Sequence, residues 1–169
     1  MPRPDLSRVP AYYHNYINKV AQDDLSNALQ QHQGTLTAFL ETLPADKWNY
    51  RYAEGKWSVK ELMQHIIDAE RIFAYRALTF ARKDKTPLPG FEENDYAAAS
   101  EADRREPYSL LTELKTVQAA TLTLFDSFSP EQLDAEGMAN GKPVYVAAIG
   151  FIMAGHALHH LDVLKERYC

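Results

Sequence analysis

The stretch Gly155-His156-Ala157-Leu158-His159-His160 places three histidines within an otherwise apolar segment near the C-terminus. Residues four apart are neighbours on an α-helix, about 6 Å apart along its axis, so His156 and His160 can direct their rings at one point. Apolar side chains recur at helical spacing around this pair and fall on the same face. These side chains are Ile149, Ile152, Met153, Val163 and Leu164. The spacing therefore predicts a buried helix whose core face carries two imidazoles.

Two imidazoles that face the core need a further ligand to make a metal site, because a catalytic zinc-type site has three protein ligands and an open position. His65 is the first candidate, since it lies on a second apolar stripe formed by Leu62, Ile66, Ala69, Ile72 and Phe73. His32 remains an alternative on a third stripe, which contains Leu25, Leu29, Leu36, Phe39 and Leu43. At about 100° per residue, His159 falls roughly 80° from the middle of its stripe, so we expect it at the flank. His14 precedes the first periodic segment and has no such placement.

The bulk composition indicates one globular domain. At 169 residues the chain is long enough for a single domain, 1–169, and 46% hydrophobic and 24% charged residues are ordinary values for such a protein. A formal net charge of -5, with no cluster of lysines and arginines, disfavours a nucleic-acid partner. The single cysteine, Cys169, allows no internal disulfide and fits a reducing compartment.

The sequence predicts neither export nor membrane insertion. The residues after Met1 lack the apolar run of a secretory signal, so we expect the protein to be cytoplasmic. The longest apolar stretch, Val144 to Gly155, is shorter than the roughly 20 residues needed to cross a bilayer. We therefore expect no membrane partner.

The first 43 residues predict an arm and a helix. Residues 1–22 contain three prolines and several tyrosines and are expected to form an N-terminal arm that packs across the domain. A helix should begin at Asp23, a good N-cap residue, and run to Leu43, because Pro44 cannot continue it.

The best-defined helix start is the capping box Ser58-Val59-Lys60-Glu61. In such a box the serine hydroxyl accepts a hydrogen bond from the glutamate amide, and the glutamate side chain accepts one from the serine amide. The box fixes the phase of a second helix, which carries His65 and should end near Arg82.

The segment from Lys83 to Glu106 has no periodicity and contains two prolines and a glycine. A connection of this length can return the chain along the full bundle, so we interpret it as a crossover to a helix parallel to the second. Its acidic stretch, Glu92-Glu93-Asn94-Asp95, is expected to be solvated surface, with a lid or a partner contact as the alternative.

Two further helices complete the predicted fold. Pro107 opens the third helix, and the polar linker Ser129 to Lys142 ends in the turn signal Asn140-Gly141. Pro143 should open the fourth helix, which carries the histidine pair. No alternating strand pattern is visible, so the sequence predicts an all-α four-helix bundle without a sheet.

Two motifs give the sequence a family resemblance: Glu54-Gly55-Lys56-Trp57-Ser58-Val59-Lys60-Glu61-Leu62 ahead of His65, and Gly155-His156 followed by His160. In this order and separation they resemble the DinB-like (YfiT-like) superfamily over essentially the whole chain. The resemblance implies an up-down-down-up bundle with the long loop as a crossover between helices 2 and 3. It also implies a divalent-metal site with His65, His156 and His160 as ligands. Family habit, together with surplus apolar and aromatic residues in the arm and linkers, suggests a homodimer.

The resemblance leaves several function classes open. Characterised relatives include transferases and isomerases that use low-molecular-weight thiols such as bacillithiol, mycothiol or glutathione. A metal held by three neutral imidazoles can lower the pKa of a bound thiol or water. The first expectation is therefore a metal-dependent enzyme that transfers a small-molecule thiol to an electrophile. The alternatives are a metal-dependent hydrolase and a non-enzymatic, stress-associated protein that binds a metal or a small molecule.

Ligand type and position suggest the metal and the surroundings of the site. Three imidazoles favour zinc or nickel over iron or manganese. The linker ahead of the second helix should lie near that helix, so Trp48, Tyr52 and Trp57 are candidate walls of a substrate pocket. Glu61 and Asp68 lie about one turn either side of His65 and are candidates to orient its ring.

Overall fold

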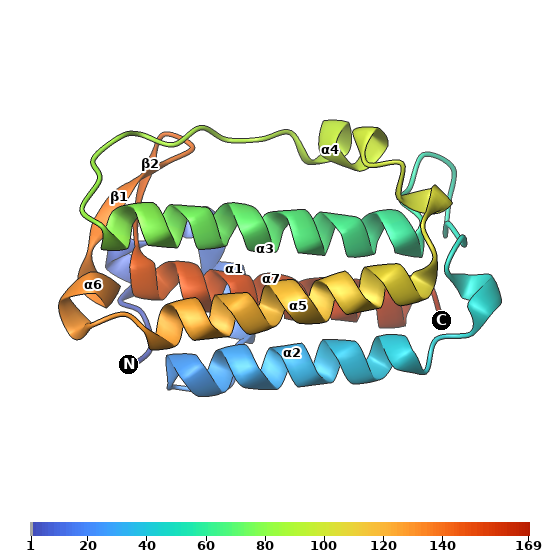
Figure 1. Ribbon diagram of the computed structural model, residues 1–169, viewed down its shortest axis with the longest axis horizontal. Coiled ribbons are helices and arrows are strands. Elements are labelled where there is room, and N and C mark those ends of the chain that lie inside the picture. Colours follow the sequence, from blue (N-terminus) through green and yellow to red (C-terminus); the bar gives the residue numbers. More distant parts are fainter. Residues whose placement is uncertain (1) are drawn as a thin grey trace.

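The protein is built around a bundle of long helices (Figure 1). The computed structural model describes residues 2–169. Within that range the four long helices are α2 (Leu25–Glu41), α3 (Val59–Ala81), α5 (Pro107–Asp126) and α7 (Val146–Arg167). In Figure 1, α2 and α7 run in one direction, and α3 and α5 run in the other. The predicted up-down-down-up bundle, with a long crossover between α3 and α5, is therefore confirmed.

Shorter elements join the long helices. The shorter α-helices are α1 (His14–Lys19), α4 (Glu93–Ala99) and α6 (Pro130–Asp134). Single 3-10 turns occur at Leu6–Arg8, Ala11–Tyr13, Ala45–Lys47 and Ala102–Arg104. Two strands, β1 (Glu136–Ala139) and β2 (Lys142–Tyr145), pair as an antiparallel hairpin.

The crossover contains α4, which the sequence pattern did not predict. Acidic residues in its first turn, Glu93 and Asp95, complement the positive end of the helix dipole, and the run Ala97-Ala98-Ala99 favours helix. The helix has seven residues, too few to give a recognisable apolar stripe.

The capping box of α3 is confirmed. The Ser58 hydroxyl accepts a hydrogen bond from the Glu61 amide at 3.1 Å, and the Glu61 carboxylate accepts one from the Ser58 amide at 2.8 Å. The start of α2 differs from the prediction by one residue, because Asp24 rather than Asp23 accepts a hydrogen bond, at 3.1 Å, from the Asn27 amide.

The β-hairpin corrects the expectation of a chain without a sheet. Asn140 and Gly141 have positive φ angles of 50° and 69°, which match the two-residue turn of a hairpin. Pro143 lies in β2 opposite Met138, so it does not open a helix, and α7 begins at Val146. Each strand has four residues, which is too short to show a clear alternation of apolar and polar positions.

The crossover is attached to this hairpin. The Leu88 amide donates a hydrogen bond to the Met138 carbonyl at 2.9 Å, and the Asn140 amide donates one to the Leu88 carbonyl at 3.0 Å. The hairpin lies at the end of the bundle where α3 ends and α7 begins (Figure 1). These bonds therefore fix the beginning of the crossover at that end.

Two clusters of buried apolar side chains form the core. One includes Phe73 from the second half of α3 and Ile152 from the first half of α7, and the other includes Ile66 and Leu161 from the opposite halves. By length and composition α7 could cross a membrane, with a mean hydropathy of 1.3 over its most apolar window. However, 72% of that window is buried inside the protein, as is usual for a core helix.

Candidate metal centre and the adjoining pocket

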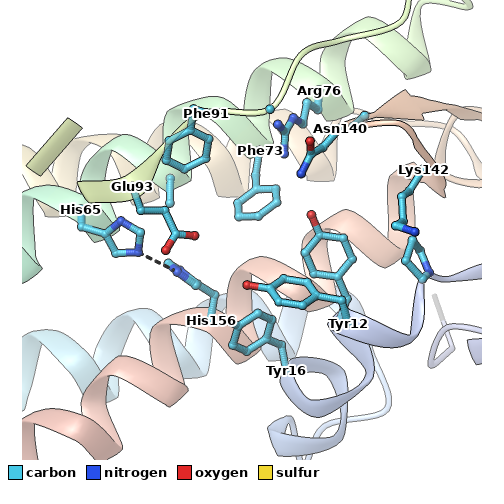
Figure 2. Close-up of a pocket in the computed structure, with 15 residues that line it drawn as sticks. Tyr12, Tyr16, His65, Phe73, Arg76, Phe91, Glu93, Asn140, Lys142 and His156 are labelled. Atoms are coloured by element: carbon cyan, nitrogen blue, oxygen red, sulfur yellow. Dashed lines mark hydrogen bonds between the residues drawn. The ribbon is translucent and has the colours of Figure 1, made fainter. Parts of the chain in front are cut away.

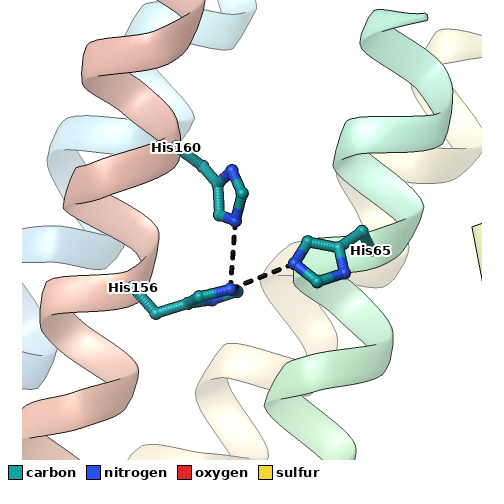
Figure 3. A group of neighbouring side chains, drawn as sticks. All are labelled: His65, His156 and His160. Carbon is teal, nitrogen blue, oxygen red and sulfur yellow. Dashed lines mark hydrogen bonds between the residues drawn. The ribbon is translucent and has the colours of Figure 1, made fainter. Parts of the chain in front are cut away.

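Three histidines from two helices converge where the apolar clusters meet (Figure 3). His65 lies on α3, and His156 and His160 lie one turn apart on α7. The Nε2 atom of His156 is 3.0 Å from Nε2 of His65 and 3.0 Å from Nε2 of His160. A ring nitrogen carries one hydrogen or one lone pair in the ring plane, so His156 Nε2 cannot serve both contacts as good hydrogen bonds. A shared cation explains the convergence better.

The geometry fits a divalent metal ion. One nitrogen from each histidine lies within 4.8 Å of the other two. In a tetrahedral site with metal–nitrogen distances of about 2.0–2.1 Å, the ligand nitrogens are roughly 3.4 Å apart, which small ring rotations would reach. Three imidazoles also leave a coordination position for solvent or substrate.

Burial keeps these imidazoles neutral. His65 is 4% exposed and His156 is 7% exposed. Burial lowers the pKa of His65 to about 4. Burial, followed by repulsion between neighbouring imidazoles, lowers the pKa of His156 and His160 well below the usual value. Because the neutral ring is the form that binds metal, the group is prepared for a cation at neutral pH.

The remaining histidines lie outside this group. His32, the alternative ligand, is buried on α2, and its Nδ1 atom contacts a backbone carbonyl of the same helix. Burial lowers the pKa of His32 to about 4. His159 lies at the flank of its helix, as the spacing predicts, with its ring 5.6 Å from that of Tyr16. His14 contacts two backbone carbonyls of the N-terminal arm.

The two acidic residues proposed to orient His65 make other contacts. Glu61 caps α3 and pairs with Arg51. Asp68 accepts a hydrogen bond from Gln64 at 2.9 Å. Among the described residues, neither carboxylate has a hydrogen bond to His65, because Glu61 is committed to the helix start and Asp68 to a side chain on its own helix.

The three aromatic residues expected in a pocket wall have different positions. The Trp57 ring lies 4.9 Å from the His65 ring, centroid to centroid. Trp48 is buried in one of the apolar clusters, and Tyr52 packs edge-on against Tyr168 at 5.1 Å. None of the three is among the described residues that line the pocket beside the histidines.

A pocket of about 300 Å³ opens beside the histidines (Figure 2). His65 and His156 form one end of it, so an ion bound there would be reachable from the pocket. Its apolar lining includes Ala69, Phe73 and Phe91. Its polar side chains come from the arm, α3, the crossover and the hairpin, and they include Tyr12, Tyr16, Arg76, Glu93, Asn140 and Lys142.

The sequence reasoning missed three charged residues of this pocket, which are Glu93, Arg76 and Lys142. Glu93, in the acidic stretch expected to be solvated surface, directs its carboxylate into the pocket on the side of His65 and His156 (Figure 2). Partial burial and the neighbouring Glu92 raise the pKa of Glu93. Arg76 lies eleven residues after His65, or about three helical turns, and therefore on the same face of α3. That spacing could have identified it from the sequence.

A family comparison agrees with this site. A family model described as the DinB superfamily matches residues 28–164, a range that contains all three histidines. The chain belongs to the DinB superfamily. The resemblance seen in the sequence motifs is therefore confirmed.

One curated relative and two solved structures are similar to this DinB-superfamily protein. A relative from Oceanobacillus iheyensis, named "Putative metal-dependent hydrolase", is 26% identical over 153 residues, which are 87% of each chain. YfiT from Bacillus subtilis, a solved structure described as a probable metal-dependent hydrolase with an unusual four-helix bundle topology, matches with a TM-score of 0.72 and 14% identity over 84% of this chain and 82% of YfiT. The mycothiol-dependent maleylpyruvate isomerase matches with a TM-score of 0.67 and 15% identity over 82% of this chain and 58% of the isomerase.

At such identities the solved structures show the shared fold. The metal dependence in the names of the relatives and the three-histidine group together support a divalent metal in this DinB-superfamily protein.

Proposed function

We propose that this protein is a divalent-metal-dependent hydrolase of small organic molecules. The observation that carries the proposal is that the Glu93 carboxylate enters the pocket that His65 and His156 of the three-histidine group line (Figure 2). A divalent metal held by His65, His156 and His160 would supply Lewis acidity and lower the pKa of water. Zinc or nickel fits these ligands better than iron or manganese.

Glu93 is suited to move the proton in this reaction. Its pKa is raised by partial burial and by Glu92, which brings the carboxylate closer to the range of an efficient general base near neutral pH. In hydrolysis Glu93 accepts a proton from the attacking water, whose oxygen bonds to the electrophilic carbon. The bond to the leaving group then breaks, and Glu93 returns the proton to that group.

The aromatic lining holds the body of the substrate. Phe73 and Phe91 present apolar rings to the pocket, and Tyr16 lies edge-on to His156 at 5.6 Å between ring centroids. Apolar contact on these faces positions the reacting bond near the histidines and removes bulk water from it.

Transfer of a low-molecular-weight thiol is the second candidate, because a three-imidazole metal site can also lower the pKa of a thiol. The shared fold with a mycothiol-dependent isomerase favours it. The pocket volume favours hydrolysis, since about 300 Å³ is at the lower limit for organic ligands and suits one small molecule with water. A thiol cofactor and an electrophile together would need more space.

A panel assay tests the proposal. Chromogenic esters and amides, and in parallel several thiols with a chromogenic electrophile, are assayed with and without added metal, using wild type and His160→Ala. We expect metal-dependent hydrolysis that the variant loses. If only thiol conjugation responds to metal, the transferase replaces the hydrolase. If neither reaction exceeds the metal-free rate, the protein is a non-enzymatic binder.

A further inference from the structure

Arg76 is a buried cation without a counter-ion. Its side chain is 4% exposed, and none of the ion pairs formed within residues 2–169 includes it. A buried charge is costly unless it is paired and hydrogen-bonded. No carboxylate among residues 2–169 therefore neutralises this charge, at a position that lines the pocket.

The guanidinium is only partly used by the protein. Its Nη2 atom donates a hydrogen bond to the Pro89 carbonyl at 2.8 Å, and the Phe73 ring lies 5.5 Å away. The Tyr13 hydroxyl lies near this cation. Burial raises the pKa of Tyr13, and the positive charge of Arg76 partly offsets the rise. An arginine has five N–H donors, so donors remain for a ligand in the pocket.

The position of Arg76 gives the ligand an orientation. Arg76 and His65 share one face of α3 with Phe73 close to it, and their Cα atoms are separated by about 16 Å of helix rise. In Figure 2, Arg76 and Asn140 lie at one end of the pocket and the histidines at the other. Glu93 lies at the histidine end and would repel an anion there. Among the protein's own charges, the Arg76 end therefore favours an anionic group, and a metal ion at the histidine end would be the competing site for it.

We propose that Arg76, with Asn140 beside it, binds an anionic group of the substrate, such as a carboxylate, and that the apolar body lies on Phe73 with the reacting bond toward the histidines. A guanidinium can hold a carboxylate or a phosphate through two parallel hydrogen bonds. The inference deepens the proposed hydrolase and rests on it for the reaction, but binding of the anion itself needs no catalysis.

Binding of three matched probes tests the site. The purified full-length chain, loaded with metal, is titrated in a calorimeter with 4-phenylbutyrate, its neutral amide 4-phenylbutanamide, and 3-phenylpropyl phosphate. We expect the carboxylate to bind about tenfold more tightly than the amide, as for a hydrogen bond to a charged group. Comparison with the phosphate shows which anion the site prefers.

Variants on the same helix test whether Arg76 is the cause of the preference for the anion. Arg76→Gln should lose the preference for the anion, and Arg76→Lys should keep part of it, which covers the case in which the glutamine variant folds poorly. The matched control is Arg71→Gln, since Arg71 is half-exposed, pairs with Glu113 and does not line this pocket. The control should keep the full preference.

Two results would overturn the inference. One is equal binding of carboxylate, phosphate and amide by wild type. The other is an anion preference that survives in Arg76→Gln but disappears after chelation, because the metal would then hold the anion. The hydrolase proposal can fail separately. If the protein prefers anions but hydrolyses nothing, the anion site at Arg76 stands and the hydrolase is wrong. If the protein hydrolyses substrates but shows no preference for anions, the hydrolase stands and the anion site is wrong.

Discussion

The backbone carbonyl of Tyr16 lies directly against Gly155, so that a Cβ atom at position 155 would collide with it. This contact brings α1 onto α7 one residue before His156. It places the Tyr16 ring edge-on to the His156 ring, 5.6 Å between centroids. The glycine that precedes the first histidine of α7 is therefore a packing requirement of the arm.

Gly155→Ala should destabilise the protein by about 1–3 kcal/mol, the usual cost of overpacking a tight contact. The control is Gly34→Ala on α2, where nothing lies within 4 Å of an added Cβ. That change should stabilise the helix by about 0.5–1 kcal/mol. Urea unfolding of both variants measures the difference, and equal stabilities would contradict a close packing of α1 on α7.

Metal binding should depend on the inward histidines and not on their neighbour. His160→Ala removes one of three ligands, and we expect metal affinity to fall by more than about 100-fold, since even outer partners of a ligand can be worth that much. His159→Ala, at the flank of the same helix, should bind metal as wild type does. Competition with a chelator, using protein purified without a histidine tag, gives both affinities. If His160→Ala and His159→Ala bound metal with the same affinity, the proposed metal site would be wrong.

Glu93→Gln should lower kcat by about 10²- to 10⁴-fold, the range for loss of a general acid or base, with metal content unchanged. An acidic limb due to Glu93 should appear in the wild-type rate profile and vanish in the variant, because a protonated carboxyl cannot accept a proton from water. Asp95→Asn is the control, since Asp95 belongs to the same acidic stretch, is exposed and does not line the pocket. Loss of activity in both variants alike would instead indicate a structural role for the acidic stretch.

A buried glutamate should make stability depend on pH. Glu70 is 3% exposed, and burial raises its pKa from 4.5 to about 7, although Thr121 opposes the rise. An acid with a raised pKa stabilises the folded state below its ordinary pKa and loses this contribution as the pH rises through the folded value. The window of loss is therefore about pH 4.5 to 7.

Glu70→Gln should flatten this dependence. In wild type, ionisation of Glu70 should cost about 3 kcal/mol of the free energy of unfolding between acidic pH and pH values above the window, which corresponds to the shift in pKa. The variant should not lose this amount, because glutamine does not ionise. Denaturant unfolding across the pH range measures it, with the exposed Glu166→Gln as a control that leaves the slope unchanged. Parallel curves for wild type and Glu70→Gln would show that Glu70 is ionised in the fold.

Local signals in the sequence were enough for the long helices and for the pair His156 and His160, while the choice of His65 over His32 as the third histidine rested on the family resemblance. The Ser58 capping box fixed the start of α3, and the four-residue spacing of His156 and His160 placed both rings on the core face. These features depend on neighbours within one helical turn, which the sequence displays directly.

Features that depend on contacts between distant segments were missed. The hairpin strands are short, and β2 contains Pro143, so the turn at Asn140-Gly141 was visible while its strands were not. The entry of Glu93 into the pocket depends on the crossover, which hydrogen bonds at Leu88 attach to β1, more than forty residues further along the chain. No periodicity within the crossover encodes that attachment.

The residues around the pocket come from two kinds of segment. The metal ligands stand on α3 and α7, whose packing is fixed by the core, while most of the other lining residues come from the arm, the crossover and the hairpin. Substitutions in these three connecting segments can alter which molecule is accepted without disturbing the ligands. Natural variation should therefore diversify substrates in the connections first, and directed evolution toward a new substrate should begin there.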